Sequence, residues 1–492
     1  MLLSPALAPL CRRLGPALTA ADFSESAVAG RLGDAYACLS RGEPGPVEAA
    51  AGGDGPLDVL IRLFLAAAPV PRPLADGALA PVTVDEAIAA GLLEPDPEDA
   101  SRVRAALGLR PLDLPDGPQF FLSDLDGLMR PHPQHREHVL GVGHASQSLL
   151  RATPREPVGS VLDLGTGCGV HACAATRFAD AVTATDVSER AAGFAAASAA
   201  LNGADVEVLT GDWFAPVAGR RFDLVLANPP FVVGEGRVDH TYRDSGLDLD
   251  GASELVVRGA PEHLAPGGTA ALLASWVHRE DETWQARVAS WLPAEGIAAW
   301  VLQRDVADPA LYVGTWLRDE GLDPRTGEGR AKSDRWLAHL ADAGVSGIGF
   351  GFVLLRAIDG PSEVVCEELA HPFDDPLGDE VPAHFARMAW LRDGDLDAAR
   401  PLLGDDVALE RVSIGGDEGW DEVAVRVTRM SGPRWSHEID DAGARLLAGC
   451  RGELPTEDLV LLLEAATGSD GLAESARRLL ADLHRHGFVT FL

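Results

Sequence analysis

The chain is poor in cysteine and lysine, and it has no long apolar run. Its 492 residues include six cysteines without paired spacing, so a disulfide framework or a structural zinc site is not expected. The best apolar stretch, 59–70, is too short to span a membrane and is interrupted by Arg62. The first arginines follow the N-terminal apolar stretch, the reverse of a secretory signal. We therefore expect a cytoplasmic protein.

Positive charge is scarce throughout. The chain has 41 Lys and Arg against 75 Asp and Glu, a formal net charge of −34, and only Lys332 is a lysine. Proteins that hold nucleic acid draw much of their affinity from basic side chains on phosphates. This balance therefore disfavours a nucleic-acid partner, unless a local arginine patch binds one. Solubility is the simpler explanation of the acidic excess.

The length predicts about three domains of roughly 150 residues each. The first, 1–126, shows helical periodicity and then two extended pieces around the turn residues 115–117. The helices are predicted at 27–39, 56–68 and 84–91, and the extended pieces at 103–109 and 119–123. The last domain, 360–492, is acidic and ends in helical patterns and a short extended tail. Both ends resemble winged helices, but their acidity favours packing or covering a substrate over binding DNA.

The middle block, 127–359, alternates extended apolar runs with helical patterns. Seven strands are predicted, at 161–164, 181–185, 206–209, 224–227, 270–274, 297–302 and 349–356. This alternation predicts an α/β fold, with βαβ units around a mostly parallel, Rossmann-like sheet of seven strands. Ligands of such sheets bind outside the carboxyl ends of the strands. An insertion of about 305–345 separates the last two strands, and the sequence leaves open whether it closes as a lid.

A glycine-rich turn follows the first predicted strand of this block. Asp163 lies near the end of the strand, and a helix is predicted from Val170. The residues between them include Gly165, Thr166, Gly167 and Gly169. Glycines at alternate positions let the backbone turn sharply and let a ligand approach without a Cβ in the way. Many dinucleotide enzymes share such a turn, so it does not by itself define the ligand.

Acidic residues end the next two strands. Asp186, followed by Val187, is placed where a carboxylate can accept hydrogen bonds from both hydroxyls of a ribose. Gly211, Asp212 and Trp213 end the third strand, where they offer a carboxylate to an adenine amino group and a ring to its face. Together with the glycine turn, these residues predict a site for a cofactor that contains adenosine.

The fourth strand ends in the tetrad 228–231, Asn-Pro-Pro-Phe. Asn and Pro are ordinary turn residues, so a plain strand-end turn is the alternative interpretation. In this order and spacing, the glycine turn, Asp186, Asp212 and the tetrad resemble the class I S-adenosylmethionine-dependent methyltransferases. The tetrad is similar to that of the branch that methylates planar nitrogens: adenine N6, guanine N2 and the glutamine side-chain amide of release factors. The resemblance covers about 141–356 and implies S-adenosyl-L-methionine as cofactor and S-adenosyl-L-homocysteine as product.

The tetrad suits a nitrogen whose lone pair is delocalised into a ring or a carbonyl. If the Asn228 side-chain oxygen and the Pro229 carbonyl accept its two hydrogens, the nitrogen is pushed toward tetrahedral geometry. Its lone pair then points at the sulfonium methyl for an in-line displacement. Phe231 would stack on the planar group, and Pro230 keeps the loop stiff.

Two loops are weaker candidates. Gly143, in the segment 141–146, is expected either to fold over the methionine end of the cofactor or to enter a helix. After the tetrad, His240, Tyr242 and Asp244 either line the substrate cavity or belong to a solvated loop. If the acceptor were a ring carbon, or a ring nitrogen with one hydrogen, His240 or Asp244 is the predicted base.

Histidines and tryptophans each cluster once. The histidines are His132, His135, His138 and His144. They lack a cysteine or carboxylate set at ligand spacing, so no metal site is predicted. Six of the ten tryptophans lie in 276–336, where they form core or, in part, a wall for an aromatic substrate.

The sequence thus predicts a methyltransferase that uses S-adenosylmethionine and acts on a planar acceptor. The charge balance favours a small heteroaromatic metabolite of the indole type, as in secondary metabolism. The alternatives, which the resemblance favours, are a nucleobase amine in ribosomal or transfer RNA and a protein glutamine amide. A further alternative is a regulatory protein that binds the cofactor without catalysis. The oligomeric state is left open.

Overall fold

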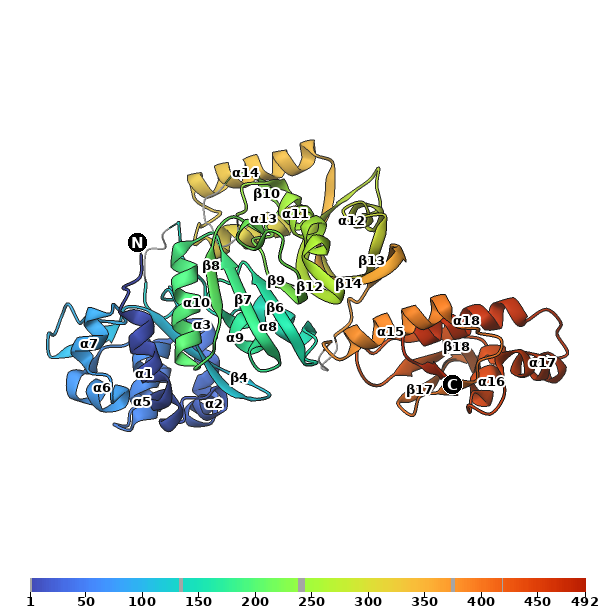
Figure 1. Cartoon of the computed structure of the whole chain (residues 1–492), viewed down its shortest axis with the longest axis horizontal. Helices are drawn as coiled ribbons and strands as arrows, with labels where there is room; N and C mark the ends of the chain where they lie inside the picture. Colours follow the sequence, from blue (N-terminus) through green and yellow to red (C-terminus); the bar gives the residue numbers. More distant parts are fainter. Residues whose placement is uncertain (1, 132–135, 238–243, 373–376, 418) are drawn as a thin grey trace. The chain divides into compact units, whose positions relative to one another are not determined.

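The computed structural model describes every residue except 1, 132–135, 238–243, 373–376 and 418. The chain divides into two compact units (Figure 1). The larger comprises 1–150 and 156–368, and the smaller comprises 151–155 and 369–492. Among the described residues, no helix combines the length and the apolar character that crossing a membrane requires.

The larger unit begins with short helices around a core of apolar side chains. They are α1 (Leu7–Ala20), α2 (Glu25–Leu32), η1 (Gly33–Ala37), α3 (Cys38–Arg41), α4 (Pro44–Ala50), α5 (Pro56–Leu60) and η2 (Ile61–Leu65). The predicted helical patterns at 27–39 and 56–68 are confirmed, although each is divided into shorter pieces. The first helix, α1, was not predicted.

A winged-helix arrangement follows these helices. It consists of β1 (Val70–Pro71), α6 (Arg72–Leu79), α7 (Val84–Ala89), β2 (Leu93–Pro95) and β3 (Arg102–Ala105). The three strands form an antiparallel sheet with β3 in the middle. A capping box between Thr83 and Glu86 begins α7 and leaves Asp85 and Glu86 in its first turn. Because carboxylates there would repel phosphates, the helix is poorly suited to DNA.

The predicted hairpin differs from the one observed. The segment 103–109 is not one strand, because it divides between β3 and β4 (Gly108–Leu114). β4 pairs across the predicted turn with β5 (Gly117–Ser123). The hairpin of the winged helix is instead β2 with β3.

The N-terminal elements pack directly on the sheet domain through α10 (Glu189–Leu201). The Phe120 backbone N–H in β5 donates to Asn202 Oδ1 at 2.8 Å, and Asn202 Nδ2 donates to the Phe120 carbonyl at 2.9 Å. A Cβ at Gly15 in α1 would lie 2.0 Å from the Leu201 carbonyl oxygen, so only glycine allows this approach. α10 is therefore covered on several sides, which explains its almost uniformly apolar sequence.

The central sheet of the larger unit has eight strands (Figure 1). They are β6 (Val158–Leu164), β7 (Ala179–Asp186), β8 (Glu207–Thr210), β9 (Phe222–Ala227), β12 (Leu264–Arg279), β13 (Glu295–Ala307), β14 (Val345–Pro361) and β15 (Glu363–Glu368). Their order is β15-β13-β14-β12-β9-β6-β7-β8, and only β14 runs antiparallel to its neighbours. All seven predicted strands are present. The eighth, β15, pairs with β13 and carries the sheet past the predicted boundary at residue 359.

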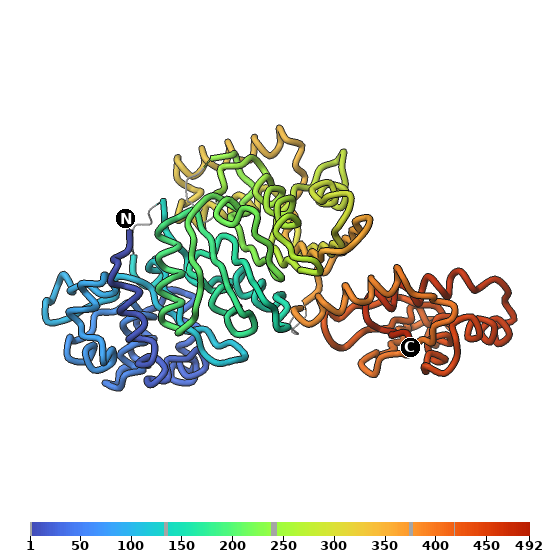
Figure 2. Tube along the Cα trace, viewed as in Figure 1, coloured from blue at the N-terminus to red at the C-terminus, as the bar shows by residue number. Residues whose placement is uncertain are grey.

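Helices and small strands complete this unit. They are α8 (His144–Ala152), α9 (Val170–Ala175), η3 (Ala215–Val217), β10 (Gly234–Glu235), β11 (Asp248–Leu249), α11 (Gly251–Gly259), η4 (Ala260–His263) and α12 (Trp284–Ala289). The predicted insertion contains α13 (Pro309–Asp319) and α14 (Gly327–Asp342), the gold segment of Figures 1 and 2. Both helices bury apolar side chains against Val232 and Val233, directly after the tetrad.

The tryptophans of 276–336 are mostly core residues. Trp276, Trp284 and Trp291 lie in one buried cluster, Trp336 lies in a second, and Trp300 is also buried. Only Trp316 in α13 is half-buried. The interpretation as core is therefore confirmed for all but this one.

The smaller unit has a three-stranded meander and a group of helices. Its elements are α15 (Glu380–Asp393), β16 (Pro401–Leu403), β17 (Val407–Gly416), β18 (Gly419–Arg429), β19 (Ser436–Ile439), α16 (Asp441–Gly449), α17 (Thr456–Thr467), α18 (Ala473–Arg485) and β20 (Val489–Phe491). The helical patterns predicted here, at 440–449, 455–466 and 472–486, and the extended tail predicted at 488–492 are confirmed. The tail pairs with β16, which precedes the helices. In a winged helix, both strands of the hairpin follow the helices, so this pair of strands differs from a wing.

Candidate functional site

The predicted site residues meet at the carboxyl ends of neighbouring parallel strands. Strand pairing places Leu164 of β6 opposite Ala227 of β9 and Thr185 of β7, and Asp186 opposite Thr210 of β8. The four loops that follow these strands therefore leave one edge of the sheet side by side. This is the position where α/β sheets bind their ligands.

Asp163 is fully buried at the base of this edge. Its Oδ2 accepts hydrogen bonds from Thr166 Oγ1 at 2.6 Å and from the Ala172 backbone N–H at 3.0 Å. Its Oδ1 accepts none from the residues that the structure describes, and the nearest cation candidate, His171 Nδ1, is 3.8 Å away. Burial raises the pKa of Asp163. An orphaned carboxylate oxygen suits a ligand ammonium or amide group.

The glycine turn is open on the ligand side. Gly165, Gly167 and Gly169 have φ of +70°, +55° and +85°. A Cβ at either of the first two would meet no protein atom within 4 Å, whereas one at Gly169 would lie 2.9 Å from Ala195 Cα. The third glycine thus permits packing on α10. The first two leave space in which a ligand can approach the backbone.

Asp186 connects this turn to the end of β7. Its Oδ2 accepts the Gly167 N–H at 3.0 Å, and its Oδ1 accepts the Ser188 N–H at 2.9 Å. Burial raises the pKa of Asp186, although both backbone N–H groups act to lower it. Beside it, the Val187 side chain is 56% exposed. A carboxylate next to an exposed apolar side chain matches what a ribose and an adenine require.

The end of β8 lies against Asp186 through the backbone. The Gly211 N–H donates to the Asp186 carbonyl at 2.9 Å. A Cβ at Gly211 would lie 2.6 Å from Pro216 Cγ, so the tight turn here needs glycine. Asp212 is exposed, and Trp213 holds a left-handed backbone, with φ of +44°, while its ring packs on the core. Strain of this kind is often found at binding sites.

The tetrad is held at both of its ends. Asn228 Nδ2 donates to Ser146 Oγ in α8 at 3.2 Å. The Phe231 carbonyl accepts from the buried Ser275 hydroxyl in β12 at 2.6 Å, and the Phe231 ring lies 5.2 Å from the ring of Phe350 in β14. Asn228, Pro230 and Phe231 are half-buried, and Pro229 is buried.

The residues after the tetrad are anchored to the insertion. The Val233 N–H donates to the Tyr312 hydroxyl at 2.8 Å, and the Val233 carbonyl accepts from Trp336 Nε1 at 3.0 Å. His240 and Tyr242 lie outside the described residues, so their predicted role stays a prediction. Asp244 is described and half-buried.

Sequence reasoning found the strand ends but missed three side chains that hold the tetrad. These are Ser146, Ser275 and Phe350. Gly143 is exposed, and its carbonyl accepts the Gln147 N–H at 3.1 Å. The segment 141–146 therefore leads into α8, which is one of the two predicted alternatives. Ser146 could have been found from the sequence, because it belongs to the candidate segment 141–146.

No group of three or more potential metal ligands is present among the described residues. His138 is buried with its Nδ1 3.9 Å from Asp124 Oδ2, and His144 is exposed at the start of α8. His132 and His135 lie outside the described residues.

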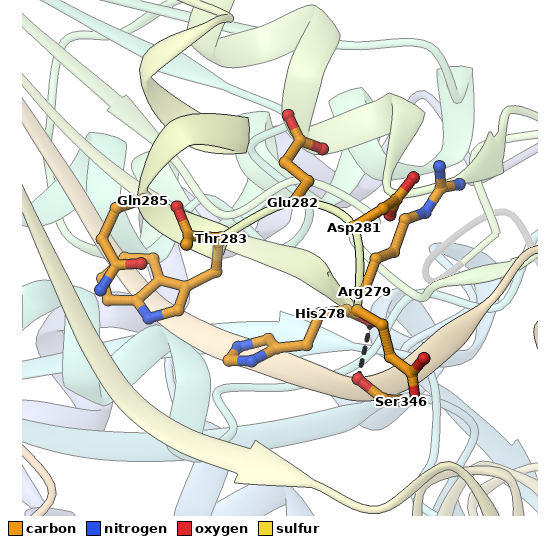
Figure 3. A pocket seen from close by; sticks show the side chains of 9 residues that line it. His278, Arg279, Asp281, Glu282, Thr283, Gln285 and Ser346 are labelled. Atoms are coloured by element: carbon orange, nitrogen blue, oxygen red, sulfur yellow. Dashed lines mark hydrogen bonds between the residues drawn. The ribbon is translucent and has the colours of Figure 1, made fainter.

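A separate hollow of about 330 Å³ lies beyond the end of β12 (Figure 3). It is lined by His278, Arg279, Glu280, Asp281, Glu282, Thr283, Trp284, Gln285 and Ser346. The Ser346 hydroxyl donates to the His278 carbonyl at 3.2 Å. None of the predicted site residues is part of its lining.

Comparison with known families gives three matches along the chain. Residues 140–281 match the methyltransferase small domain. Residues 20–106 and 382–491 match two domains of unknown function, DUF7059 and DUF7782.

Curated relatives are similar to part of the chain. The release factor glutamine methyltransferase of Cereibacter sphaeroides is 38% identical over 137 residues, 25% of this chain and 49% of the relative. The ribosomal protein uL3 glutamine methyltransferase of Bradyrhizobium diazoefficiens is 34% identical over 186 residues, 34% of this chain and 57% of the relative. The ribosomal RNA small subunit methyltransferase C of Escherichia coli is 35% identical over 137 residues, 27% of this chain and 36% of the relative. The chain thus spans between 36% and 57% of the length of these relatives.

The sheet order, the glycine turn and the strand-end carboxylates define a Rossmann-like, class I methyltransferase domain. Its cofactor is S-adenosylmethionine, which the residues present fit: an open turn at Gly165 and Gly167, an orphaned oxygen on Asp163, and a carboxylate at Asp186. Within this class, residues 140–281 match the methyltransferase small domain, and the Asn-Pro-Pro-Phe tetrad at 228–231 fits the branch that carries this motif.

Proposed function

We propose that the protein is an S-adenosylmethionine-dependent methyltransferase whose acceptor is a planar nitrogen carrying two hydrogens, namely a glutamine side-chain amide in a protein. The observation that carries this proposal is the arrangement of Asn228. Its Nδ2 is hydrogen-bonded to Ser146, and its Oδ1 accepts no hydrogen bond from the described residues. The side chain therefore offers a hydrogen-bond acceptor beside the cofactor turn.

The chain's own residues would bind and orient both reactants. Gly165, Gly167 and Asp186 hold the cofactor, which supplies an electrophilic methyl group when bound. Asn228 Oδ1 and the Pro229 carbonyl would accept hydrogen bonds from the two N–H groups of the amide, so that the nitrogen lone pair faces the methyl group. As the nitrogen is methylated, it releases one of its two protons to water. Phe231, fixed against Phe350, stacks on the amide plane. Alignment provides most of the rate gain in such a displacement.

Two observations favour a protein over the other acceptors. Two of the three relatives are named for glutamine methylation of a release factor and of a ribosomal protein. The net charge of −34 would attract a basic protein and repel the phosphates of an RNA. The expectation of a small heteroaromatic metabolite finds no support in the relatives, each of which is named for a macromolecular acceptor.

The second candidate acceptor is a nucleobase amine in ribosomal RNA. One relative is named for it, and the tetrad suits an exocyclic amine equally well. An RNA acceptor would need a local cluster of arginines to offset the overall charge.

A labelled cofactor distinguishes these acceptors. The protein is incubated with methyl-labelled S-adenosylmethionine and purified bacterial ribosomes with release factor, and RNA, protein and small-molecule fractions are then separated and hydrolysed. We expect label in protein, released as methylglutamine. Label in a methylated base would favour the second candidate. The same incubation is repeated with a cell extract. Label confined to its small-molecule fraction would favour the small heteroaromatic acceptor predicted from the charge balance. Cofactor binding without transfer to any fraction would indicate a regulatory protein.

A further inference from the structure

Asn228 has a side chain whose two ends are nearly identical in shape but opposite in hydrogen bonding. Oδ1 only accepts hydrogen bonds and Nδ2 only donates them. Facing the substrate, Oδ1 can pair with an N–H of the nitrogen to be methylated, whereas Nδ2 would place a second donor opposite that N–H. The role of Asn228 therefore depends on which end faces the substrate.

Ser146 contacts the donor end. Its hydroxyl lies 3.2 Å from Asn228 Nδ2, which is the geometry of a neutral hydrogen bond. The two residues are far apart in the chain and come from different elements, the first turn of α8 and the end of β9. With Nδ2 occupied in this way, Oδ1 is the end that remains for a substrate N–H.

The position of Ser146 is itself set by the cofactor side of the site. The Ser146 carbonyl lies 3.1 Å from His171 Nε2, and because a carbonyl only accepts, this nitrogen carries the proton. His171 is 3% exposed and belongs to α9, the helix that follows the glycine turn. Ser146 thus connects the cofactor-binding helix through its backbone with the tetrad through its side chain.

We propose that Ser146 is a positioning residue, whose hydroxyl holds the Asn228 amide with Nδ2 turned away from the acceptor and Oδ1 toward it. The consequence for transfer rests on the proposed function. When a substrate N–H pairs with Oδ1, the Ser146 hydroxyl keeps Nδ2 satisfied, so both halves of the amide are used. Without the hydroxyl, the amide loses the contact that selects this orientation.

The amino-acid composition allows a direct test of the contact. The chain contains two asparagines, Asn202 and Asn228. Protein labelled with [15N]asparagine therefore has two side-chain NH2 groups in its 1H–15N spectrum, and Asn228→Ala assigns them. The Asn202 group is an internal reference, because it donates to the Phe120 and Ser198 carbonyls at 2.9 and 2.8 Å.

We expect Ser146→Ala to shift the Asn228 NH2 signals and to leave those of Asn202 in place. Ser146→Thr, which keeps a hydroxyl, should restore them most of the way. Ser148→Ala, on the same helix, is the control for any change in α8 and should move neither pair. Unchanged Asn228 signals in Ser146→Ala would overturn the proposal, whether or not the acceptor is known.

Kinetics then test the consequence. We expect Ser146→Ala to lower kcat about three- to tenfold, the effect of one neutral hydrogen bond, with the cofactor Kd unchanged and recovery in Ser146→Thr. In the Asn228→Ala background, Ser146→Ala should cause no further loss, because it acts through Asn228. An additive loss would contradict the positioning role. Absence of transfer by the unmodified protein would instead contradict the proposed function, while the spectrum still decides on Ser146.

Discussion

Arg190 and Asp124 form an ion pair that is buried on both sides, with Arg190 Nε 2.9 Å from Asp124 Oδ2. Arg190 lies in the first turn of α10, shortly after Asp186 at the end of β7. Asp124 follows the N-terminal hairpin and also accepts the Val139 N–H at 2.9 Å. The pair therefore fastens the segment that leads to Gly143 onto the helix that begins at the cofactor site.

Removing the carboxylate from this pair should be costly. Asp124→Asn removes the carboxylate charge that pairs with the buried Arg190, and we expect a loss of about 3–5 kcal/mol in the stability of the larger unit. Urea unfolding measures it. Asp126→Asn is the control, because its ion pair with Arg110, at 3.1 Å, is half-exposed and should contribute less than about 1 kcal/mol. Equal effects of the two variants would show that the buried pair is not a structural anchor.

Asp186 should determine cofactor affinity. Charge-assisted hydrogen bonds to a carboxylate contribute roughly 1.5–3 kcal/mol, so Asp186→Ala should raise the cofactor Kd about 10- to 100-fold. Calorimetry measures this directly. Asp180→Ala removes an exposed carboxylate from the opposite end of the same strand and should leave the Kd unchanged. If the two variants bind equally well, the ribose does not lie on Asp186.

Cofactor affinity should also depend on pH through Asp186. Burial raises its pKa, so the carboxylate protonates at a higher pH than an exposed one. Because ribose hydroxyls donate to the ionised form, affinity should fall as the pH is lowered through this raised pKa. Stability has the opposite sign: the contribution of the raised pKa is complete below the unfolded-state pKa and is lost as pH rises through the folded-state value. Asp186→Asn should remove the part of the pH dependence of cofactor affinity that comes from Asp186. If the pH profile of this variant were unchanged, another group would be responsible for that dependence.

The parts of the fold that sequence predicted are those with a strong local signal. Each central strand is an apolar run bounded by turn residues, and the site motifs occupy the strand ends, so their positions follow from the parallel sheet. The helix α1 was missed although its buried leucines have helical spacing, because Pro16 interrupts the pattern. The strand β15 was missed because its acidic, half-exposed sequence lacks the apolar character of a central strand.

The contacts that orient the site could not be predicted in the same way. Ser146 and Asn228 are 82 residues apart, and nothing local to either indicates the other. The same holds for Ser275 with Phe231, 44 residues apart. Such pairs depend on how α8 and β12 extend over the carboxyl edge of the sheet. Sequence patterns therefore placed the candidate site residues at the strand ends, whereas the side chains that contact them follow from the tertiary fold.

Asn228→Ala should separate transfer from binding. The substitution removes the acceptor for one hydrogen of the substrate nitrogen, so we expect methyl transfer to fall about 100- to 1,000-fold while the cofactor Kd stays within a few-fold. Asn202→Ala is a control for loss of an asparagine distant from the edge. It is expected to lower stability by breaking the contact with Phe120 and to leave kcat of the folded protein unchanged. Normal turnover by Asn228→Ala would refute the role of the tetrad.

Phe231 should act on the acceptor rather than on the cofactor. Its half-buried ring is tilted by 44° against that of Phe350, and in the proposed function one ring face stacks on the planar acceptor. Phe231→Leu keeps an apolar side chain but removes this face, and a stacking contact of about 1 kcal/mol predicts a roughly fivefold rise in the KM for the acceptor. Because the backbone carbonyl of residue 231 still accepts from Ser275, the loop should keep its position and the cofactor Kd should not change. A rise in the cofactor Kd with an unaltered acceptor KM would place the ring against the cofactor instead.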